Sequence, residues 1–248
     1  MSLAERLADA IRDRRAIEPP DDDLSIDDAY DAQDELLKLL GGEVVAAKLG
    51  LTSRAKQEQM NVGEPIYGWL TDVMGLDAGE PVPCAELIQP RVEPEIAFLI
   101  RDELRGRGVT AARVLAATEA VLPALDVLDS RFTGYRFTLP SVIADDASAG
   151  RFRLGNPIAL ERGTDLRLVG CVFEKNGEVV ATAAGAAVLD HPAAAVAWFV
   201  RKLAERSRAL PARTIVLAGA LTAAVAIEPG DVVGASFDRI GSVELACR

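Results

Sequence analysis

The spacing of the apolar residues changes near residue 43, from the repeat of a helix to the repeat of a strand, and this change restricts the fold most. Before it, the spacing predicts helices over 2–15 and 25–40. The first begins with a Ser-x-x-Glu capping box at Ser2. The second begins at Ser25 and ends at Gly41-Gly42, a typical helix stop. The chain is therefore expected to start with a helical segment.

Beyond residue 43, short apolar runs alternate with Gly, Pro and Asn, which is typical of strands joined by turns. Helices are expected over 110–120 and 192–206, and tight turns at Lys175-Asn-Gly-Glu and Glu228-Pro-Gly-Asp. The expected strands span 44–51, 82–83, 91–101, 124–128, 158–160, 166–175, 178–184, 214–218, 231–237 and 243–246. These elements predict an α+β protein with a β-rich body after the helical start.

Charge and hydropathy exclude several classes of partner. The 248 residues include 27 Lys and Arg against 38 Asp and Glu, a net charge of −11, which repels nucleic-acid phosphates and anionic lipids. No apolar run approaches the roughly 20 residues that cross a bilayer, and the first residues lack the apolar core of a signal peptide. We therefore expect a cytoplasmic protein without nucleic-acid or membrane partners.

The single histidine, His191, restricts the chemistry. A catalytic serine triad would have to use it, and a metal site with several histidines cannot be built. Its position before a proline at an expected helix start favours a structural capping role. Cys84, Cys171 and Cys247 lie far apart without a Cys-x-x-Cys motif, so we expect buried apolar residues. A metal ion in this chain would have to be bound mainly by oxygen.

Two carboxylates lie in the run Arg91-Val-Glu-Pro-Glu-Ile-Ala-Phe-Leu-Ile. Glu93 and Glu95 are two residues apart on an expected strand and project to the same face, which Ala97 and Leu99 continue. Carboxylates beside apolar side chains are unfavourable unless a cation or water neutralises them, and a divalent metal would do so. The alternative is a half-exposed strand with a solvated acidic end.

A third carboxylate, Asp126, lies between Leu125 and Val127 in an apolar run. It shares a strand face with Ala124 and Leu128, so it is expected to point inward and to need a partner, either an arginine or a metal ion. Three carboxylates with water suit Mg²⁺ or Mn²⁺, which keep positions open for substrate oxygens.

Lys48 interrupts the apolar run of residues 44–51, just before Thr52 and Ser53. An ammonium group inside the protein would fix a substrate carboxylate or take part in proton transfer. The alternative is that its long side chain reaches the surface. Lys48 and Thr52 are candidate substrate-binding residues.

Six motifs together resemble the hydratase and decarboxylase branch of the fumarylacetoacetate hydrolase superfamily. The resemblance runs from about residue 28 to residue 243, nearly the whole chain. The motifs are KLGLTSRAKQEQMNVGEPIYGWL, PRVEPEIAFLI, PALDVLDSR, SVIADDASAGRFRLG, EKNGEVVATAAGAAVLDHP and AGALTAAVAIEPGDVV.

The resemblance implies the superfamily's mixed-sheet body, with a helical and α/β segment over 1–75 and a β-rich catalytic domain over 76–248. It implies Mg²⁺- or Mn²⁺-dependent decarboxylation of 2-oxo-3-hexenedioate to 2-hydroxypenta-2,4-dienoate in aromatic meta-cleavage catabolism, or alternatively hydration of that dienoate. The implied partners are the 2-oxo acid, further copies of the chain and a sister hydratase. A non-catalytic partner of a hydratase, and acyl-pyruvate or oxaloacetate chemistry, stay open.

The resemblance also implies roles for particular residues. Glu93, Glu95 and Asp126 would ligate the metal. Lys48 falls on the family's active-site lysine, and Ser148 on a pocket serine, so both are candidates for catalysis and for substrate binding.

Three positions depart from the branch: Asp126 replaces its usual Glu, Asp146 replaces an Asn, and Asp190 replaces a Gly before the His-Pro pair. The shorter Asp126 side chain is expected to alter the distance to the metal or its affinity, and Asp146 adds a negative charge. Arg54 and Arg131 are candidate cations for the second carboxylate of a dicarboxylic substrate.

Overall fold

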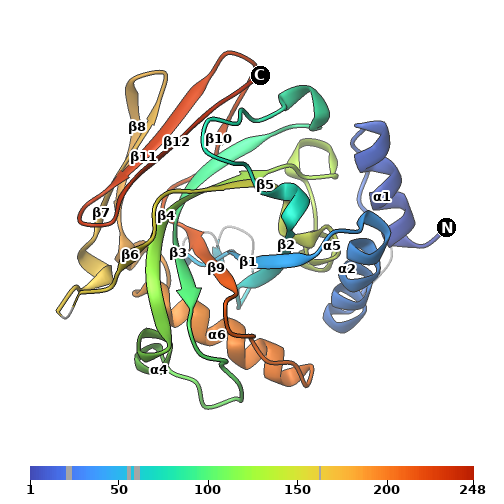
Figure 1. The fold of residues 1–248 in the computed structure, drawn as a ribbon. Helices are drawn as coiled ribbons and strands as arrows, with labels where there is room; N and C mark the ends of the chain where they lie inside the picture. Colours follow the sequence, from blue (N-terminus) through green and yellow to red (C-terminus); the bar gives the residue numbers. More distant parts are fainter. Residues whose placement is uncertain (21–23, 55–56, 59–61, 162) are drawn as a thin grey trace.

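A computed structural model of the chain combines a large curled sheet, a smaller sheet and several helices (Figure 1). This confirms the expected α+β class with a helical start and a mixed-sheet body. None of the helices it describes has both the length and the apolarity needed to cross a bilayer. The model describes residues 1–20, 24–54, 57–58, 62–161 and 163–248, so part of the motif beginning at Lys48, residues 55–56 and 59–61, lies outside them.

The large sheet has eight strands, of which β1 and β9 run parallel and the other described pairs antiparallel. Its main path is β2 (Ile66–Thr71), β1 (Val44–Gly50), β9 (Ile215–Ala220), β3 (Arg91–Ile100), β4 (Thr118–Leu128) and β5 (Ala149–Leu154). Short strands β10 (Val225–Ala226) and β6 (Ile158–Ala159) pair with β3 and β4.

The sheet curls until its two edges meet. Just after β2, Gly75 forms a bridge with Phe152 of β5, and the Leu76 N–H donates to the Phe152 carbonyl at 2.9 Å. The curl separates two cores, because successive residues of a strand project to opposite faces. The smaller core includes Ala46, Ala97 and other residues on the face that also carries Lys48 and Glu95. The candidate site therefore belongs to this face.

The second sheet lies beside the first and has four antiparallel strands (Figure 1). Its order is β12 (Gly241–Ala246), β11 (Val232–Phe237), β7 (Gly170–Lys175) and β8 (Glu178–Ala184). The predicted Asn-Gly turn joins β7 to β8, with Asn176 and Gly177 both at positive φ. The second expected turn is also present, since the Asp231 N–H donates to the Glu228 carbonyl at 3.1 Å.

Helices cover the large sheet from two sides: α6 packs on β9 and β1, while α1 and α2 pack together with α5 (Figure 1). The α-helices whose bounds are described are α1 (Leu3–Asp13), α2 (Ile26–Leu40), α4 (Ala111–Ala116), α5 (Leu139–Ala144) and α6 (Pro192–Glu205). The 3₁₀ turns are η1 (Asp72–Met74), η2 (Cys84–Glu86), η3 (Thr133–Tyr135), η4 (Asp146–Ser148), η5 (Leu166–Leu168) and η6 (Gly185–Ala187).

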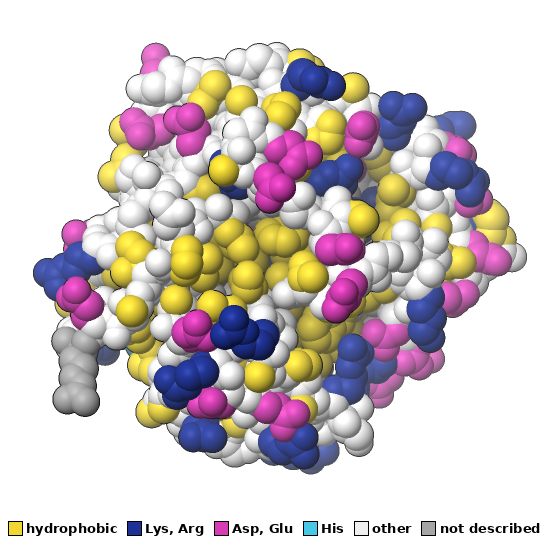
Figure 2. All heavy atoms as spheres, in the orientation of Figure 1, with side chains coloured by type: hydrophobic (Ala, Val, Ile, Leu, Met, Phe, Trp, Pro, Cys, Tyr) yellow, Lys and Arg dark blue, Asp and Glu magenta, His cyan; other side chains and the backbone are white. Residues whose placement is uncertain are grey.

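The predicted helix ends are confirmed at their caps. Ser2 forms a capping box with Glu5, Ser25 accepts from the Asp28 N–H, and Gly41 ends α2. Figure 2 shows acidic and basic side chains interspersed around an apolar centre on one face of the molecule, so opposite charges neutralise each other locally there.

Several element boundaries differ from the sequence-based expectations. The helix expected over 110–120 ends at Ala116, because the chain enters β4 at Thr118. Residues 82–83 are not a strand, since Val82 only bridges Cys247, and residues 166–168 form a 3₁₀ turn before β7. The sequence interpretation missed α5, β2, β5 and β10. All six β2 residues are buried, so it shows no alternating pattern. The division at residue 75 stays a prediction.

Candidate metal and substrate site

The three carboxylates singled out in the sequence meet at neighbouring strands. In the β3–β4 register Glu93 lies opposite Asp126, and Glu95 follows on the same face opposite Ala124. One carboxylate oxygen from each of the three lies within 4.8 Å of the others, and all three side chains are buried. The alternative of a solvated acidic end is therefore wrong.

Lys48 lies against this group. Its Nζ is 2.6 Å from Oδ2 of Asp126, and its side chain is only 1% exposed, so the alternative that it reaches the surface is wrong. Among the described residues, the ion pair recorded for Asp126 is with this lysine. Lys48 pairs in register with Leu217 of β9, which pairs with Ala97 of β3, so Lys48 lies on the same face of the sheet as the carboxylates.

Glu95, like Asp126, is fully buried. Burial raises the pKa of Glu95 well above its usual range, and the negative charges of Asp126 and Glu93 raise it further, while Lys48 and the Gly219 N–H oppose them. That N–H donates to Oε2 at 2.5 Å. Oε1 has no hydrogen-bond partner among the described residues.

The donor set fits a hard divalent cation. Three carboxylates are buried together, with the Lys48 ammonium group paired to one of them, and burial makes such a concentration of negative charge costly unless cations balance it. Carboxylate oxygens at this mutual spacing are the ligands that Mg²⁺ and Mn²⁺ prefer. The free oxygen of Glu95 supplies a ready ligand atom.

A cavity of about 130 Å³ opens beside Lys48 and Glu93. Among the described residues that line it, Lys48 is the single cation, and most of the others are apolar or aromatic. The lining residues are Lys48, Gly50, Leu51, Ile66, Glu93, Leu128, Tyr135, Phe137, Val142, Ala147 and Ser148. The cavity thus has a charged end and an apolar remainder.

Ser148 reaches this cavity from the η4 turn. Its Oγ donates to Oδ2 of Asp145 at 3.2 Å, and its N–H donates to the Asp145 carbonyl at 2.9 Å. Asp145 is fully buried, and burial raises its pKa although Arg131 opposes this. The structure therefore brings Ser148 together with Lys48 at one cavity, while their roles stay predictions.

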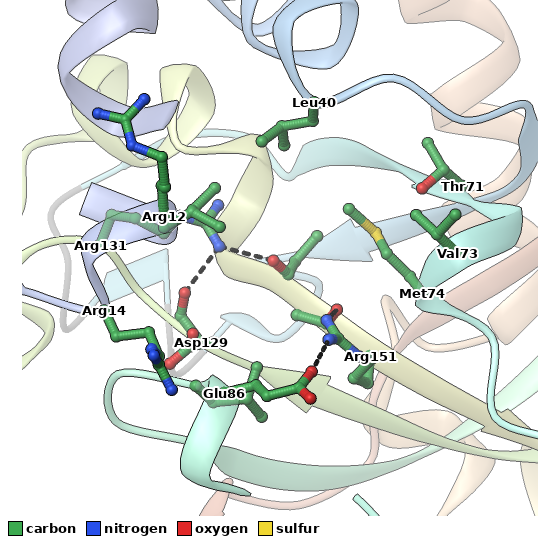
Figure 3. A pocket seen from close by; sticks show the side chains of 14 residues that line it. Arg12, Arg14, Leu40, Thr71, Val73, Met74, Glu86, Asp129, Arg131 and Arg151 are labelled. Atoms are coloured by element: carbon green, nitrogen blue, oxygen red, sulfur yellow. Dashed lines mark hydrogen bonds and ion pairs between the residues drawn. The ribbon is translucent and has the colours of Figure 1, made fainter. Parts of the chain in front are cut away.

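The two arginines considered for a distal carboxylate do not line the cavity. Arg131 is buried, forms an ion pair with Asp145 and donates to the carbonyl oxygens of Asp129 at 2.7 Å and Ala149 at 2.6 Å. It lines a separate, larger hollow of about 530 Å³ below α1 and α2 (Figure 3). Arg54 pairs with Asp190 at 2.7 Å on the surface. The structure therefore does not bring either guanidinium to the cavity that Lys48 and Glu93 line.

Thr52 and Gly219 support the site from behind Glu95. Thr52 is buried beside Gly219, whose φ is 109° and whose N–H binds Glu95. Thr52 is among the residues predicted from the sequence, whereas Gly219 and Asp145 are not. Gly219 was detectable only as a glycine within an apolar strand, and Asp145 as the neighbour of the Asp146 departure.

Replacing Gly219 by alanine is expected to lower the free energy of unfolding by about 2–4 kcal/mol. A Cβ atom would lie 2.0 Å from the Thr52 Oγ1, and an L-residue is strained at this φ. Chemical denaturation would measure the loss. Gly170→Ala is the control, because no atom lies within 4 Å of its added Cβ. A G219A protein as stable as G170A would contradict the expected clash.

His191 and the cysteines have the structural roles that the sequence predicted. The Nδ1 atom of His191 accepts a hydrogen bond from the Ala193 N–H at 3.0 Å and caps α6. Burial also lowers the pKa of His191. The three cysteines are buried as free thiols.

The chain is similar to known enzymes along nearly its whole length. It is 42% identical to 4-oxalocrotonate decarboxylase of Pseudomonas sp. (strain CF600), covering 98% of this chain and 94% of that protein. It is 38% identical to 2-keto-4-pentenoate hydratase of Paraburkholderia xenovorans (strain LB400), covering 97% and 91%.

Solved structures agree with this likeness. The structure of 4-oxalocrotonate decarboxylase from Pseudomonas putida G7 complexed with magnesium and adipate superposes with a TM-score of 0.94 at 41% identity, covering 99% of this chain and 96% of that one. A second structure of that enzyme holds calcium and acetate. The family model of the fumarylacetoacetate hydrolase C-terminal domain matches residues 43–247. The chain belongs to the fumarylacetoacetate hydrolase family.

Proposed function

We propose that this chain is a Mg²⁺-dependent decarboxylase that converts 4-oxalocrotonate, 2-oxo-3-hexenedioate, to 2-hydroxypenta-2,4-dienoate in aromatic catabolism. The observation that carries the proposal is the buried group of three carboxylates and one lysine at the end of an otherwise apolar cavity. The relatives named decarboxylases support it. Adipate, present in the Pseudomonas putida G7 structure, is a six-carbon dicarboxylate like the proposed substrate.

Glu93, Glu95 and Asp126 would hold the divalent cation, which when bound supplies positive charge against the negative charge that develops on the 2-oxo acid head. Lys48 would donate to the oxygens of that head, because it is the single cation among the described cavity residues. Ser148, held by Asp145, would orient the substrate by a hydrogen bond. Thr52 would support the carboxylate end of the site.

The reaction breaks the bond between C5 and C6, and C6 leaves as CO2. The electron pair of that bond moves through the conjugated chain to the C2 oxygen, and one proton completes the enol product. The apolar walls favour this step, because a distal carboxylate without a cationic partner is poorly solvated and loses its charge as CO2 departs. Leu51, Leu128, Phe137 and Val142 would form this wall.

Hydration of 2-hydroxypenta-2,4-dienoate is the second candidate, because a hydratase from Pseudomonas putida is 42% identical over 208 residues. The two reactions are separated by supplying 2-oxo-3-hexenedioate with Mg²⁺ and measuring CO2. We expect one CO2 for each substrate consumed, and none with Glu95→Gln. Turnover of 2-hydroxypentadienoate without CO2 from the dicarboxylate would identify the hydratase instead. Inactivity of the folded, metal-loaded chain on both substrates would favour a non-catalytic role.

The proposed product is the compound that 2-hydroxypent-2,4-dienoate hydratases are named for, so a sister hydratase would consume it directly. A complex with such a hydratase, assembly of several copies of this chain and a cytoplasmic location stay predictions.

A further inference from the structure

The η4 turn that carries Ser148 has an unusual backbone. Asp146, Ala147 and Ser148 have φ values of 50°, 50° and 57°, so three consecutive residues with side chains lie in the left-handed region. Each such residue costs of order 1 kcal/mol or more, and the conformation persists only when its surroundings enforce it. Ala147 and Ser148 line the substrate cavity, so whatever holds this turn also shapes the site.

Asp146 fastens the turn to β2. Its Oδ1 accepts a hydrogen bond from the Trp69 N–H at 2.8 Å, and its backbone presses on Gly68, where an added Cβ would lie 2.5 Å from the Asp146 carbonyl oxygen. Gly68 lies directly opposite Lys48 in the β1–β2 register. Asp146 thus connects the turn to the strand pair that carries the site's lysine.

The Asp146 carboxyl group is badly placed to carry a negative charge. It is 1% exposed, and its Oδ2 has no hydrogen-bond partner among the described residues. The charged and titratable groups that face it are Arg131, Lys48, Asp145 and Tyr67. Both cations already have carboxylate partners, Asp145 for Arg131 and Asp126 for Lys48. Burial raises the pKa of Asp146 to about 7.

We infer that Asp146 is a positioning residue that acts as a neutral carboxylic acid, holding the strained turn of Ser148 against β2, and that loss of its proton lowers the activity at alkaline pH. If the Asp146 carboxyl group ionises, its free energy is lowered by moving toward water. Such a movement would carry Ala147 and Ser148 with it. The inference rests on the proposed function for its activity readout, but protonation is also tested without any substrate.

Asp146→Asn tests the inference, because the amide has the same shape, keeps an acceptor for the Trp69 N–H and cannot ionise. Thermal melting in excess Mg²⁺ should give a difference in Tm, variant minus wild type, that grows by about 5 °C or more from pH 5 to pH 7 and then levels off. This difference grows because the raised pKa of Asp146 destabilises only the wild-type protein. The loss of wild-type stability begins as pH rises above the unfolded-state pKa of Asp146 and ends once pH exceeds its folded-state pKa.

Asp231→Asn is the matched control for stability. The Lys175 ion pair lowers the pKa of Asp231 to about 2, so it is ionised at both pH values and its variant should show a Tm difference that is constant from pH 5 to pH 7. A constant difference for D146N as well would overturn the inference, whatever the substrate of the enzyme.

The activity test measures kcat separately from KM at each pH. At pH 6 we expect D146N and wild type to have similar kcat, and from pH 6 to pH 9 the ratio of kcat, D146N over wild type, should rise at least tenfold. Asp146→Ala removes the acceptor for Trp69 and should lower kcat at every pH. A D146N protein with normal Tm but little activity at pH 6 would show that a carboxylate is required, and would overturn the neutral role.

Discussion

Replacing Lys48 by methionine is expected to lower kcat by about 10²- to 10³-fold, the usual loss when one electrostatic donor is removed from a site of this kind. Methionine keeps much of the length of the side chain but removes the ammonium group that lies 2.6 Å from Asp126. The cavity would then lack its single described cation, and a dianionic substrate would enter an uncompensated acidic site. Steady-state kinetics with saturating Mg²⁺ would measure the loss.

Lys202→Met is the matched control, because Lys202 is also partly buried and pairs with Glu64 at 3.0 Å, but lies on α6 away from the cavity lining. We expect it to keep wild-type kcat. Circular dichroism and the Mg²⁺-induced rise in Tm must show that K48M is folded and loaded. A folded K48M enzyme with more than a tenth of wild-type kcat would contradict the role assigned to Lys48.

Raising the pH from 5.5 to 7.5 is expected to tighten Mg²⁺ binding by up to about 100-fold, tenfold for each pH unit over which one proton is displaced. Burial and the neighbouring carboxylates raise the pKa of Glu95, so the metal-free protein keeps a proton there that the metal must displace. Isothermal titration calorimetry in buffers of different ionisation enthalpy would measure both the affinity and the proton released.

The same shift fixes the direction of the stability change without metal. Because the folded-state pKa of Glu95 is raised, the metal-free fold is most stable below the unfolded-state pKa and loses stability as pH rises. The Tm gained by adding Mg²⁺ should therefore grow with pH. Glu95→Gln, which cannot ionise, should flatten the pH dependence of the metal-free Tm. Mg²⁺ affinity that does not change over this pH range would contradict a proton on Glu95.

The carboxylates were predictable from the sequence because the strand period places Glu93 and Glu95 on one face and turns Asp126 inward. The proximity of the three carboxylates could not be predicted from the sequence. It depends on the β3–β4 register, which places Asp126 opposite Glu93, a residue 33 positions earlier in the chain. The alternation of residues along a strand predicts which side chains share a face of the sheet. The register between strands, in contrast, is set by packing across the completed sheet.

The positions of Lys48 and Arg131 show a second limit to prediction from the sequence. Whether a lysine in an apolar run is buried depends on a partner, and the partner of Lys48 is on a strand that does not touch β1 in the sheet order. Buried Arg131 is held by an ion pair with Asp145 and by hydrogen bonds to main-chain carbonyl oxygens, and sequence patterns do not reveal these partners. The missed strand β2 is buried throughout and lacks the alternation by which strands are found.

The place of β9 in the large sheet has a consequence for biosynthesis. In the order of the large sheet, β9 lies between the β1–β2 hairpin and β3, and its residues 215–220 come near the end of the chain. On the ribosome, therefore, the acidic strands can pair long before β9 is available to join them to the hairpin within the sheet. A nascent chain halted before residue 215 therefore lacks the strand that lies between the strand of Lys48 and the strands of the acids.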